Sequence, residues 1–320
     1  MDTRKVQVTG KSTYIVTIPK KWAVDSGLVA GSLVRISYQD DGSIAITPPA
    51  HDSDPPAKRL ELDGKSMDAI MRDIIGAYVM GYPVIEFRAD HISKETRKKI
   101  KTISQNLIGI EVVKETDTVI EINDLLDAGE FTIEKGIKRM SSLVFMMLDG
   151  LINYLKIKDD EILREIISRD DEVDRMYLLV SKQFITRLNL GRILKIDELS
   201  LIESFYYRLA AGNLERIGDH AVKIADAFSR TDVPDVALGI GESVRVSQNL
   251  VANSIESLMK SDASLANDVL SKNDTAKELL SKSMTATTVA SSPEIIFDSL
   301  SRTGDYAANI AELAIDLSQL

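Results

Sequence analysis

The sequence of 320 residues contains no cysteine, a single tryptophan and only three histidines. Without cysteine there is no disulfide, iron–sulfur cluster, thiolate zinc site or cysteine nucleophile. None of the histidines, which are His51, His91 and His220, follows a glutamate three positions earlier. The Glu-x-x-His pairs of di-iron carboxylate enzymes are therefore absent. Because no nucleophile and base occur together either, we predict that the protein is not an enzyme.

Long hydrophobic runs are also missing. The most apolar stretch, residues 143–155, is interrupted by Asp149 and Asn153 and is shorter than the roughly 20 residues that a membrane span needs. The first residues, Met-Asp-Thr-Arg-Lys-Val, contain no apolar core of a signal peptide. We therefore expect a cytoplasmic protein with no membrane insertion.

Positive charge is scarce. The formal net charge is -10 and the pI is about 5.0, which argues against attraction of the whole molecule to nucleic acid or to an anionic membrane. Residues 1–50 contain six basic and four acidic residues, so this segment carries a net charge of +2 and the remainder carries −12. The acidic residues are concentrated in the later part of the chain.

The first 50 residues predict a small β domain. Strands are expected at 5–9 and 13–18, a short helix at 20–26, and a hairpin formed by 33–38 and 44–47. Gly42 in the sequence Asp-Asp-Gly-Ser favours the hairpin turn because glycine readily adopts positive φ. A unit of this size buries too little surface to be stable alone, so we expect a homodimer.

The string from Thr13 to Trp22, Thr-Tyr-Ile-Val-Thr-Ile-Pro-Lys-Lys-Trp, followed by Gly27-Leu28, Gly31 and the Asp-Gly hairpin, resembles the SpoVT-AbrB family. The resemblance covers nearly all of residues 4–48. It implies a swapped-hairpin β barrel that dimerises, and many members bind DNA.

DNA binding by this domain stays open at this point. The DNA-binding members carry arginines in the second strand and at the end of the short helix, where this chain has Ile15, Ala23 and Val24. The lysines that remain are able to contact phosphates but offer little for reading bases. These candidate DNA-binding residues are Lys11, Lys20 and Lys21. The alternative is a domain that only dimerises.

Residues 51–58 are rich in proline and predict a semi-rigid linker. Residues 59–128 then predict a small α/β segment, with strands at 59–62, 83–88, 109–113 and 118–122 and helices at 67–80 and 93–107. Ser66 and Ser93 are suitable N-caps for the two helices. The expected domain boundaries are 1–50, 51–58, 59–128, 129–232 and 239–320.

From about residue 130 onward the pattern predicts six helices, at 131–156, 159–189, 195–229, 241–260, 262–285 and 292–319. The run Leu214-Glu-Arg-Ile-Gly-Asp-His-Ala-Val-Lys-Ile-Ala-Asp226 returns as Leu300-Ser-Arg-Thr-Gly-Asp-Tyr-Ala-Ala-Asn-Ile-Ala-Glu312. We therefore predict two three-helix-bundle repeats. Gly218 and Gly304 occupy the same repeat position, which indicates close helix approach.

Acidic residues recur at helical spacing in the first repeat. Glu215, Asp219 and Asp226 fall within an arc of about 40° on one helix. Asp170 and Asp174 share a face of the preceding helix. Like charges four residues apart destabilise a helix, so compensation is needed. Two kinds are open, salt bridges to Arg208 and Arg216 or a hard cation bound between the helices.

Glu215-Arg-Ile-Gly-Asp219-His-Ala and Asp170-Asp-Glu-Val-Asp174 resemble the two motifs of the PhoU family, and the resemblance covers about 130–320. It implies two three-helix repeats that restrain phosphate uptake through a phosphate ABC transporter, and in bacteria a sensor kinase. Several members bind iron or other divalent metals. The metal contacts implied here are Asp170, Asp174, Glu215 and Asp219, with Asp149 a weaker candidate.

The second repeat departs from this pattern. Asn273 and Lys277 stand at the positions of Asp170 and Asp174, and Ser301 replaces Glu215. A lysine among the ligands adds a competing positive charge, so we expect no metal site there.

The resemblance implies a fusion of the kind seen in archaeal regulators, a multidomain chain with an AbrB-like β barrel, a small α/β segment and two all-α PhoU repeats. The expected function is regulation of phosphate uptake and phosphate homeostasis. The expected partners are a second copy and a phosphate ABC transporter ATPase or a signalling protein, with DNA as a further candidate. The alternative is an AbrB-type transcriptional regulator whose helical domain responds to metal or phosphate.

Overall fold

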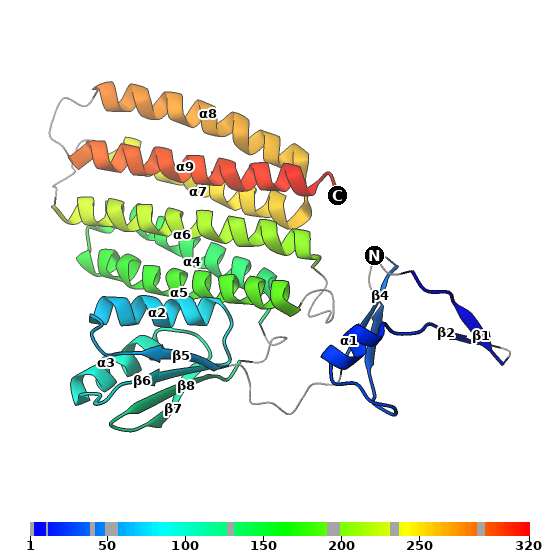
Figure 1. Cartoon of the computed structure of the whole chain (residues 1–320). Helices are drawn as coiled ribbons and strands as arrows, with labels where there is room; N and C mark the ends of the chain where they lie inside the picture. Colours follow the sequence, from blue (N-terminus) through cyan, green and yellow to red (C-terminus); the bar gives the residue numbers. More distant parts are fainter. Residues whose placement is uncertain are drawn as a thin grey trace. The chain divides into compact units, whose positions relative to one another are not determined.

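The computed structural model describes residues 3–10, 12–38, 42–48, 57–126, 131–190, 199–230, 237–286 and 292–320. Residues 3–48 of this set belong to one compact unit, and residues 57–189 and 199–320 belong to another. The described chain is mostly helical, with a small region of strands at the N-terminal end (Figure 1). This confirms the coarse fold class expected from the sequence.

The N-terminal unit consists of two hairpins and a short helix. Its elements are β1 (Gln7–Thr9), β2 (Thr13–Ile15), α1 (Lys20–Asp25), β3 (Arg35–Tyr38) and β4 (Ile44–Thr47). β1 pairs with β2 and β3 with β4, both antiparallel, in two separate sheets. Gly42 has a φ of 76° at the β3–β4 turn, as its sequence context predicts. The second strand ends at Ile15, three residues earlier than expected.

Apolar side chains of the N-terminal unit are left exposed. None of its described side chains is buried. Leu33 and Tyr38 are each 85% exposed, and Val29 and Tyr14 are nearly as open. Within the part of the chain that the structure describes, these side chains belong to neither hydrophobic core. This agrees with the expectation that so small a unit buries too little surface alone.

The second unit begins with an α/β layer. Its elements are β5 (Ala57–Glu61), α2 (Met67–Val79), β6 (Val84–Arg88), α3 (Lys94–Gln105), β7 (Ile110–Glu115) and β8 (Val119–Asp124). The four strands form one sheet in the order β5-β6-β8-β7, in which only the β5–β6 pair is parallel. The predicted N-caps are confirmed, since the side chains of Ser66 and Ser93 accept hydrogen bonds from the backbone N–H groups of Ala69 and Thr96.

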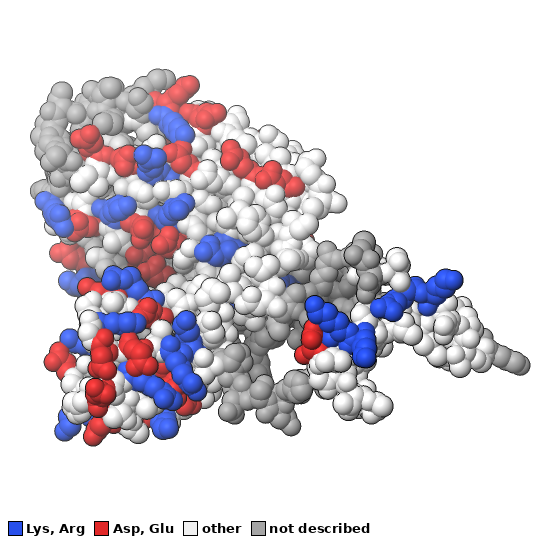
Figure 2. Space-filling model, in the orientation of Figure 1, with Lys and Arg blue, Asp and Glu red and all other residues white. Residues whose placement is uncertain are grey.

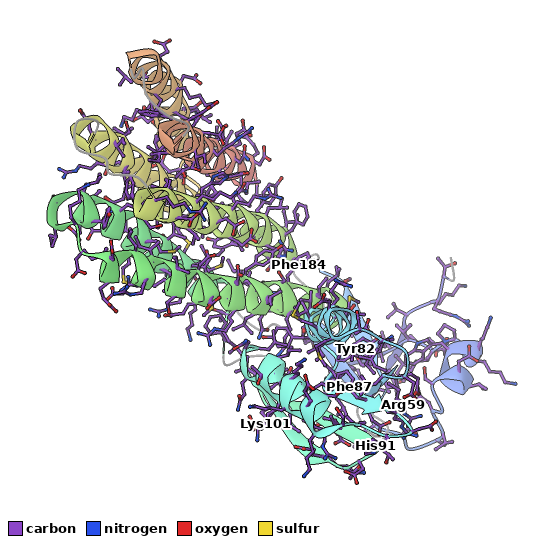
Figure 3. All side chains as sticks on the ribbon, turned by 90° about the vertical axis from the view of Figure 1, so that its left-hand side faces the viewer. Arg59, Tyr82, Phe87, His91, Lys101 and Phe184 are labelled. Atoms are coloured by element: carbon purple, nitrogen blue, oxygen red, sulfur yellow. The ribbon has the colours of Figure 1, made fainter. Side chains whose placement is uncertain are left out.

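The core of this layer lies on one face of the sheet. Ile85 and Phe87 alternate along β6 with side chains that stay more open, and Ile74 and Ile100 come from the two helices. Figure 3 shows Phe87 inside this layer, while Arg59 lies at its margin. One-sided burial is what strict alternation on a mainly antiparallel sheet produces.

Six long helices follow in the described chain, as the sequence pattern predicts. They are α4 (Ile133–Ile157), α5 (Asp160–Leu190), α6 (Leu201–Arg230), α7 (Ala237–Lys260), α8 (Ala263–Ala286) and α9 (Ser292–Leu317). The expected start of the third helix at 195 lies outside the described residues. The expected start of the fourth helix at 241 is wrong, because α7 already begins at Ala237 and includes both Gly239 and Gly241.

One continuous core runs through the helical bundle and includes residues from all six helices. α4 lies within it and contributes buried side chains such as Met140, Leu143, Val144 and Met147. Among the described helices, α4 is the one that is long and apolar enough to cross a membrane by composition, with a mean hydropathy of 1.3. A core helix of a bundle meets the same criterion, so this composition is weak support for a span.

A buried ion pair joins the α/β layer to the bundle. Lys182 on α5 lies 2.5 Å from a carboxylate oxygen of Asp124 at the end of β8, and the two side chains are only 5% and 13% exposed. The Lys182 ammonium also lies 4.8 Å from the ring centre of Tyr78 on α2. Leu178, one turn earlier on α5, packs against the core of the α/β layer. The two parts are thus held by charge and apolar contact together.

We predict that Asp124→Ala lowers the free energy of unfolding by about 3 to 5 kcal/mol, because the lysine charge is then buried without a partner. The double variant Asp124→Leu/Lys182→Met should recover most of this loss. Urea unfolding measures both. Glu256→Ala, which breaks an exposed pair with Lys260, is the control and should cost about 0.5 kcal/mol. Equal costs for Asp124→Ala and Glu256→Ala would contradict the prediction.

Candidate acidic site between helices α5 and α6

Helices α5 and α6 run antiparallel and place the four predicted acidic residues together. At one end of the pair, Arg187 of α5 donates a hydrogen bond of 2.7 Å to the hydroxyl of Ser204 of α6. At the other end, Asp170 lies against Gly218, where an added Cβ would sit 2.9 Å from its Oδ1 atom. The missing side chain at Gly218 therefore permits the close approach that its position in the motif predicts.

Burial and the charges of neighbouring carboxylates raise the pKa of Asp170 and Asp174. Burial, followed by the charges of Asp174, Asp219 and Glu215 and of the adjacent Asp171, raises the pKa of Asp170 to about 7. Burial and then Asp219 also raise the pKa of Asp174. Acidic side chains gather over α5 and α6 on the face that Figure 2 shows. The site therefore favours a proton or a cation.

Glu215 shares this environment, with partial relief from two arginines. Burial, Asp219 and Asp174 raise its pKa, whereas Arg216 and Arg208 lower it. These arginines are engaged elsewhere, since Arg208 donates to the hydroxyl of Tyr177 at 2.8 Å and the Arg216 guanidinium lies over the ring of Tyr306. In the described chain neither arginine forms an ion pair with a carboxylate of the site. Salt bridges from these two arginines therefore do not compensate the repulsion between the carboxylates, although their charges reduce it.

Oxygen donors of this kind suit a hard divalent cation. Oδ1 of Asp170 is buried without a hydrogen-bond partner, so it has free capacity to coordinate an ion. The described residues nevertheless contain no group of three or more acidic or histidine side chains close enough to hold a metal. The donor types fit a cation, but their side chains would have to draw closer around it.

The remaining predicted residues lie elsewhere. Asp149 is exposed on α4, accepts a hydrogen bond from Asn153 at 3.0 Å and is not among the charges that act on Asp170. Lys20 and Lys21 are exposed at the start of α1. Lys11 lies outside the described residues.

Two aromatic contacts of the site were not anticipated from the sequence. Tyr177, one turn after Asp174 on α5, holds Arg208 by a hydrogen bond and by its ring face, with 4.6 Å between guanidinium and ring centre. His220 is buried between α6 and α9, 5.7 Å from the ring centre of Tyr306. The repeated motif aligns His220 with Tyr306, so the sequence indicates that the two positions correspond. It does not indicate that the two side chains contact each other.

The corresponding place in the second half has a different charge. Lys277 lies 2.5 Å from a carboxylate oxygen of Asp305. Asn273 lies against Gly304, as Asp170 does against Gly218. The competing positive charge expected from the sequence is therefore paired within the protein.

Comparison with known proteins identifies the class of domain that carries this site. The PhoU domain family matches residues 137–228, which include all four acidic residues. The family "Antidote-toxin recognition MazE, bacterial antitoxin" matches residues 7–54. The chain thus carries a PhoU domain behind an N-terminal MazE/AbrB-like domain, and both resemblances seen in the sequence are confirmed.

Two curated relatives and one solved structure are similar to this chain. A phosphate-specific transport system accessory protein PhoU homolog of Aquifex aeolicus (strain VF5) is 29% identical over 47% of this chain and 67% of its own length. The homolog of Rhizobium meliloti (strain 1021) is 24% identical over 30% of this chain and 38% of its own length. The crystal structure of PhoU from Pseudomonas aeruginosa has a TM-score of 0.49 at 23% identity, over 58% of this chain and 95% of that chain.

The raised pKa of Asp170 predicts a pH dependence of stability. The folded state favours the protonated carboxyl, so this stabilisation is present below pH 4 and is lost as the pH rises through about 7. In chelator, Asp170→Asn should therefore gain stability over the unmodified protein by about 1 to 2 kcal/mol between pH 5 and pH 8, a value reduced for partial solvent screening. Urea unfolding at each pH measures this. Asp268→Asn, on the exposed side of α8, should show no such trend. A pH-independent difference for Asp170→Asn would contradict the assignment.

Proposed function

We propose that the protein regulates phosphate uptake and phosphate homeostasis by restraining a phosphate transport system through protein contacts in the cytoplasm. The observation that carries this proposal is the PhoU domain match, which spans the acidic site between α5 and α6. Two relatives that are similar to this chain are named as accessory proteins of phosphate-specific transport systems. Their names support a phosphate transport system as the partner, and we propose that the contact is made with its ATPase or with a linked signalling protein.

A role in regulation rather than catalysis is supported by the side chains at the site. It offers carboxylates and a nearby buried histidine, and a cysteine nucleophile is absent from the sequence. A proton or a cation that neutralises one of these carboxylates reduces the repulsion among them. We propose that Asp170, Asp174, Glu215 and Asp219 hold iron or another divalent metal ion, which would remove the repulsion between α5 and α6 and stiffen this part of the bundle.

The N-terminal domain has a separate proposed role. Its exposed apolar side chains and its match to the MazE family support a homodimer in which hairpins of two chains complete one β barrel. Contact with DNA through Lys20 and Lys21 is the alternative use of the same domain. The helical unit would then act on a partner as one half of a dimer.

The proposed function is tested by measuring phosphate uptake in the host after deletion of the gene. With abundant phosphate, uptake should rise after deletion and return to normal when the unmodified gene is restored. Asp170→Ala/Glu215→Ala should restore regulation only weakly, and the purified variant should lose bound metal because two of the four oxygen donors are gone.

Asp268→Ala is the matched control and should restore regulation fully. Unchanged uptake after deletion would refute the proposed function. If the purified unmodified protein holds only trace metal, the metal site is refuted while the regulatory role stands. If DNA fragments upstream of phosphate-transport genes are enriched when the protein is isolated with its bound chromatin, the transcriptional alternative is favoured.

We predict that Ile36→Glu in β3 converts the proposed dimer into a monomer, because a charge then replaces an apolar side chain that is exposed in the single chain and that the proposed barrel would bury. Light scattering after size exclusion should show the mass falling by half, while the helical content stays constant. Ser37→Glu, the next residue along the strand, points to the opposite side and is the control. A dimer that survives Ile36→Glu would place the interface elsewhere.

A further inference from the structure

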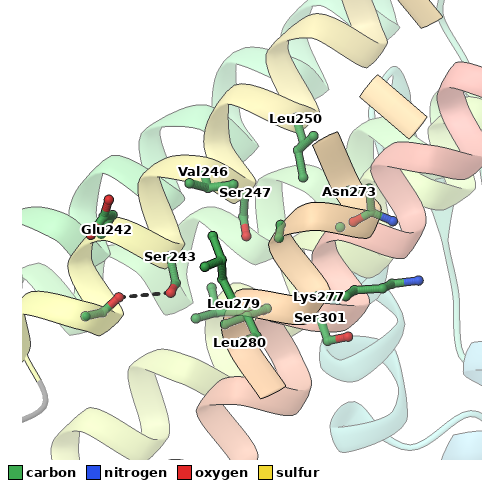
Figure 4. A pocket seen from close by; sticks show the side chains of 14 residues that line it. Glu242, Ser243, Val246, Ser247, Leu250, Asn273, Lys277, Leu279, Leu280 and Ser301 are labelled. Carbon is green, nitrogen blue, oxygen red and sulfur yellow. Dashed lines mark hydrogen bonds between the residues drawn. The ribbon is translucent and has the colours of Figure 1, made fainter. Parts of the chain in front are cut away.

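A cavity of about 170 Å³, partly open to solvent, lies between α7, α8 and α9 in the second half of the bundle (Figure 4). Its walls combine leucine and valine side chains with several polar ones. The polar residues that line it are Glu242, Ser243, Ser247, Asn273, Lys277 and Ser301. It occupies the place that the acidic site occupies in the first half, because Asn273 and Gly304 lie against each other as Asp170 and Gly218 do.

The two halves can be compared position by position. α4 and α7 each end at a residue in the left-handed conformation, Lys158 and Ser261, which are 103 positions apart. Asp170 and Asn273, which face the two glycines, are also 103 positions apart. Gly218 and Gly304 themselves are 86 positions apart. α4 and α5 therefore correspond to α7 and α8 at one constant spacing.

The cavity exists because bulky side chains of the first half have small counterparts in the second. Three residues of α4 and α5 are completely buried and fill the first bundle. Met140 corresponds to Ser243, Val144 to Ser247 and Val173 to Ala276. The backbone positions are retained while side-chain volume is lost. Close-packed protein interiors contain few voids of this size.

The cavity contains buried hydrogen-bonding groups with unused capacity. Ser247 and Asn273 are each only 4% exposed, and no described residue hydrogen-bonds the side chain of either one or of Ser301. Figure 4 shows Ser247 and Asn273 on facing helices, with Val246 and Leu250 on the same wall as Ser247. A donor or acceptor that faces a cavity without a protein partner is available to an occupant, so the site favours one that pairs with these groups.

Charge and size define the class of occupant. Among the described lining residues the cation, Lys277, is already paired with Asp305, and Glu242 lies on the opposite side of the cavity, so these side chains do not favour an anion. The volume is close to the roughly 150 Å³ of a cavity that holds one benzene, and is smaller than drug-sized pockets. The Asn273 amide offers both a donor and an acceptor. We propose that the cavity binds an uncharged, ring-sized molecule with donors and acceptors along one edge, the chemistry of a pyrimidine base.

Titration of the full-length protein with uracil, followed by ligand-observed NMR and calorimetry, tests this proposal. Saturable binding is expected, and Asn273→Leu should weaken it at least about 10-fold because the edge of the ring loses its partner. Ser247→Val/Ala276→Val, which restores the residues of the first half, should abolish binding and raise the melting temperature. Ser271→Ala, exposed on α8 outside the cavity, should bind uracil normally.

Benzene and inorganic phosphate serve as comparison ligands. Benzene that binds as tightly as uracil would overturn the proposal, because the cavity would then be apolar in effect. Phosphate that competes with uracil would overturn it in favour of an anion site. Undiminished uracil binding by the folded Ser247→Val/Ala276→Val variant, or no uracil binding by the unmodified protein at millimolar concentration, would also overturn it.

Discussion

The close packing of α5 against α6 at Gly218 is the constraint on which the acidic site depends. Because no Cβ separates the helices there, Asp170 is brought under the backbone of α6 and within reach of the charges of Glu215 and Asp219. A helix pair held further apart would leave these carboxylates solvated. The repulsion among the carboxylates is therefore a consequence of the close helix packing. A proton or a cation would reduce this repulsion.

Most of the fold could be predicted from the sequence, because the signals are local. Helical periodicity located the six long helices, and Ser66 and Ser93 marked helix starts through their side-chain oxygens. Spacing placed Asp170 and Asp174 on one helix face and Glu215 and Asp219 on another, and the resemblance to the PhoU family implied that these four form one site. The role of Tyr177 could not be predicted in this way, since the partner that it holds, Arg208, is 31 residues away. The ion pair between Lys182 and Asp124 is equally non-local.

The two halves of the bundle show how one backbone arrangement accepts different chemistry. Where the first half places Asp174 near Asp219, the second places the ammonium of Lys277 against Asp305. The second half therefore carries its own neutralising charge, whereas Arg208 and Arg216 in the first half form no ion pair with the described carboxylates of the acidic site. The same positions that are filled by methionine and valine in the first half are serines in the second, so the interior of the bundle has changed along with its charges.

Helix α5 takes part in two sites that are close in sequence. Asp174 belongs to the acidic site. Lys182 forms the ion pair with Asp124 of the α/β layer and lies eight residues later, about 12 Å along the helix axis. The acidic site and the ion pair that seats β8 against the bundle are therefore carried by a single helix, so the position of α5 sets the geometry of both.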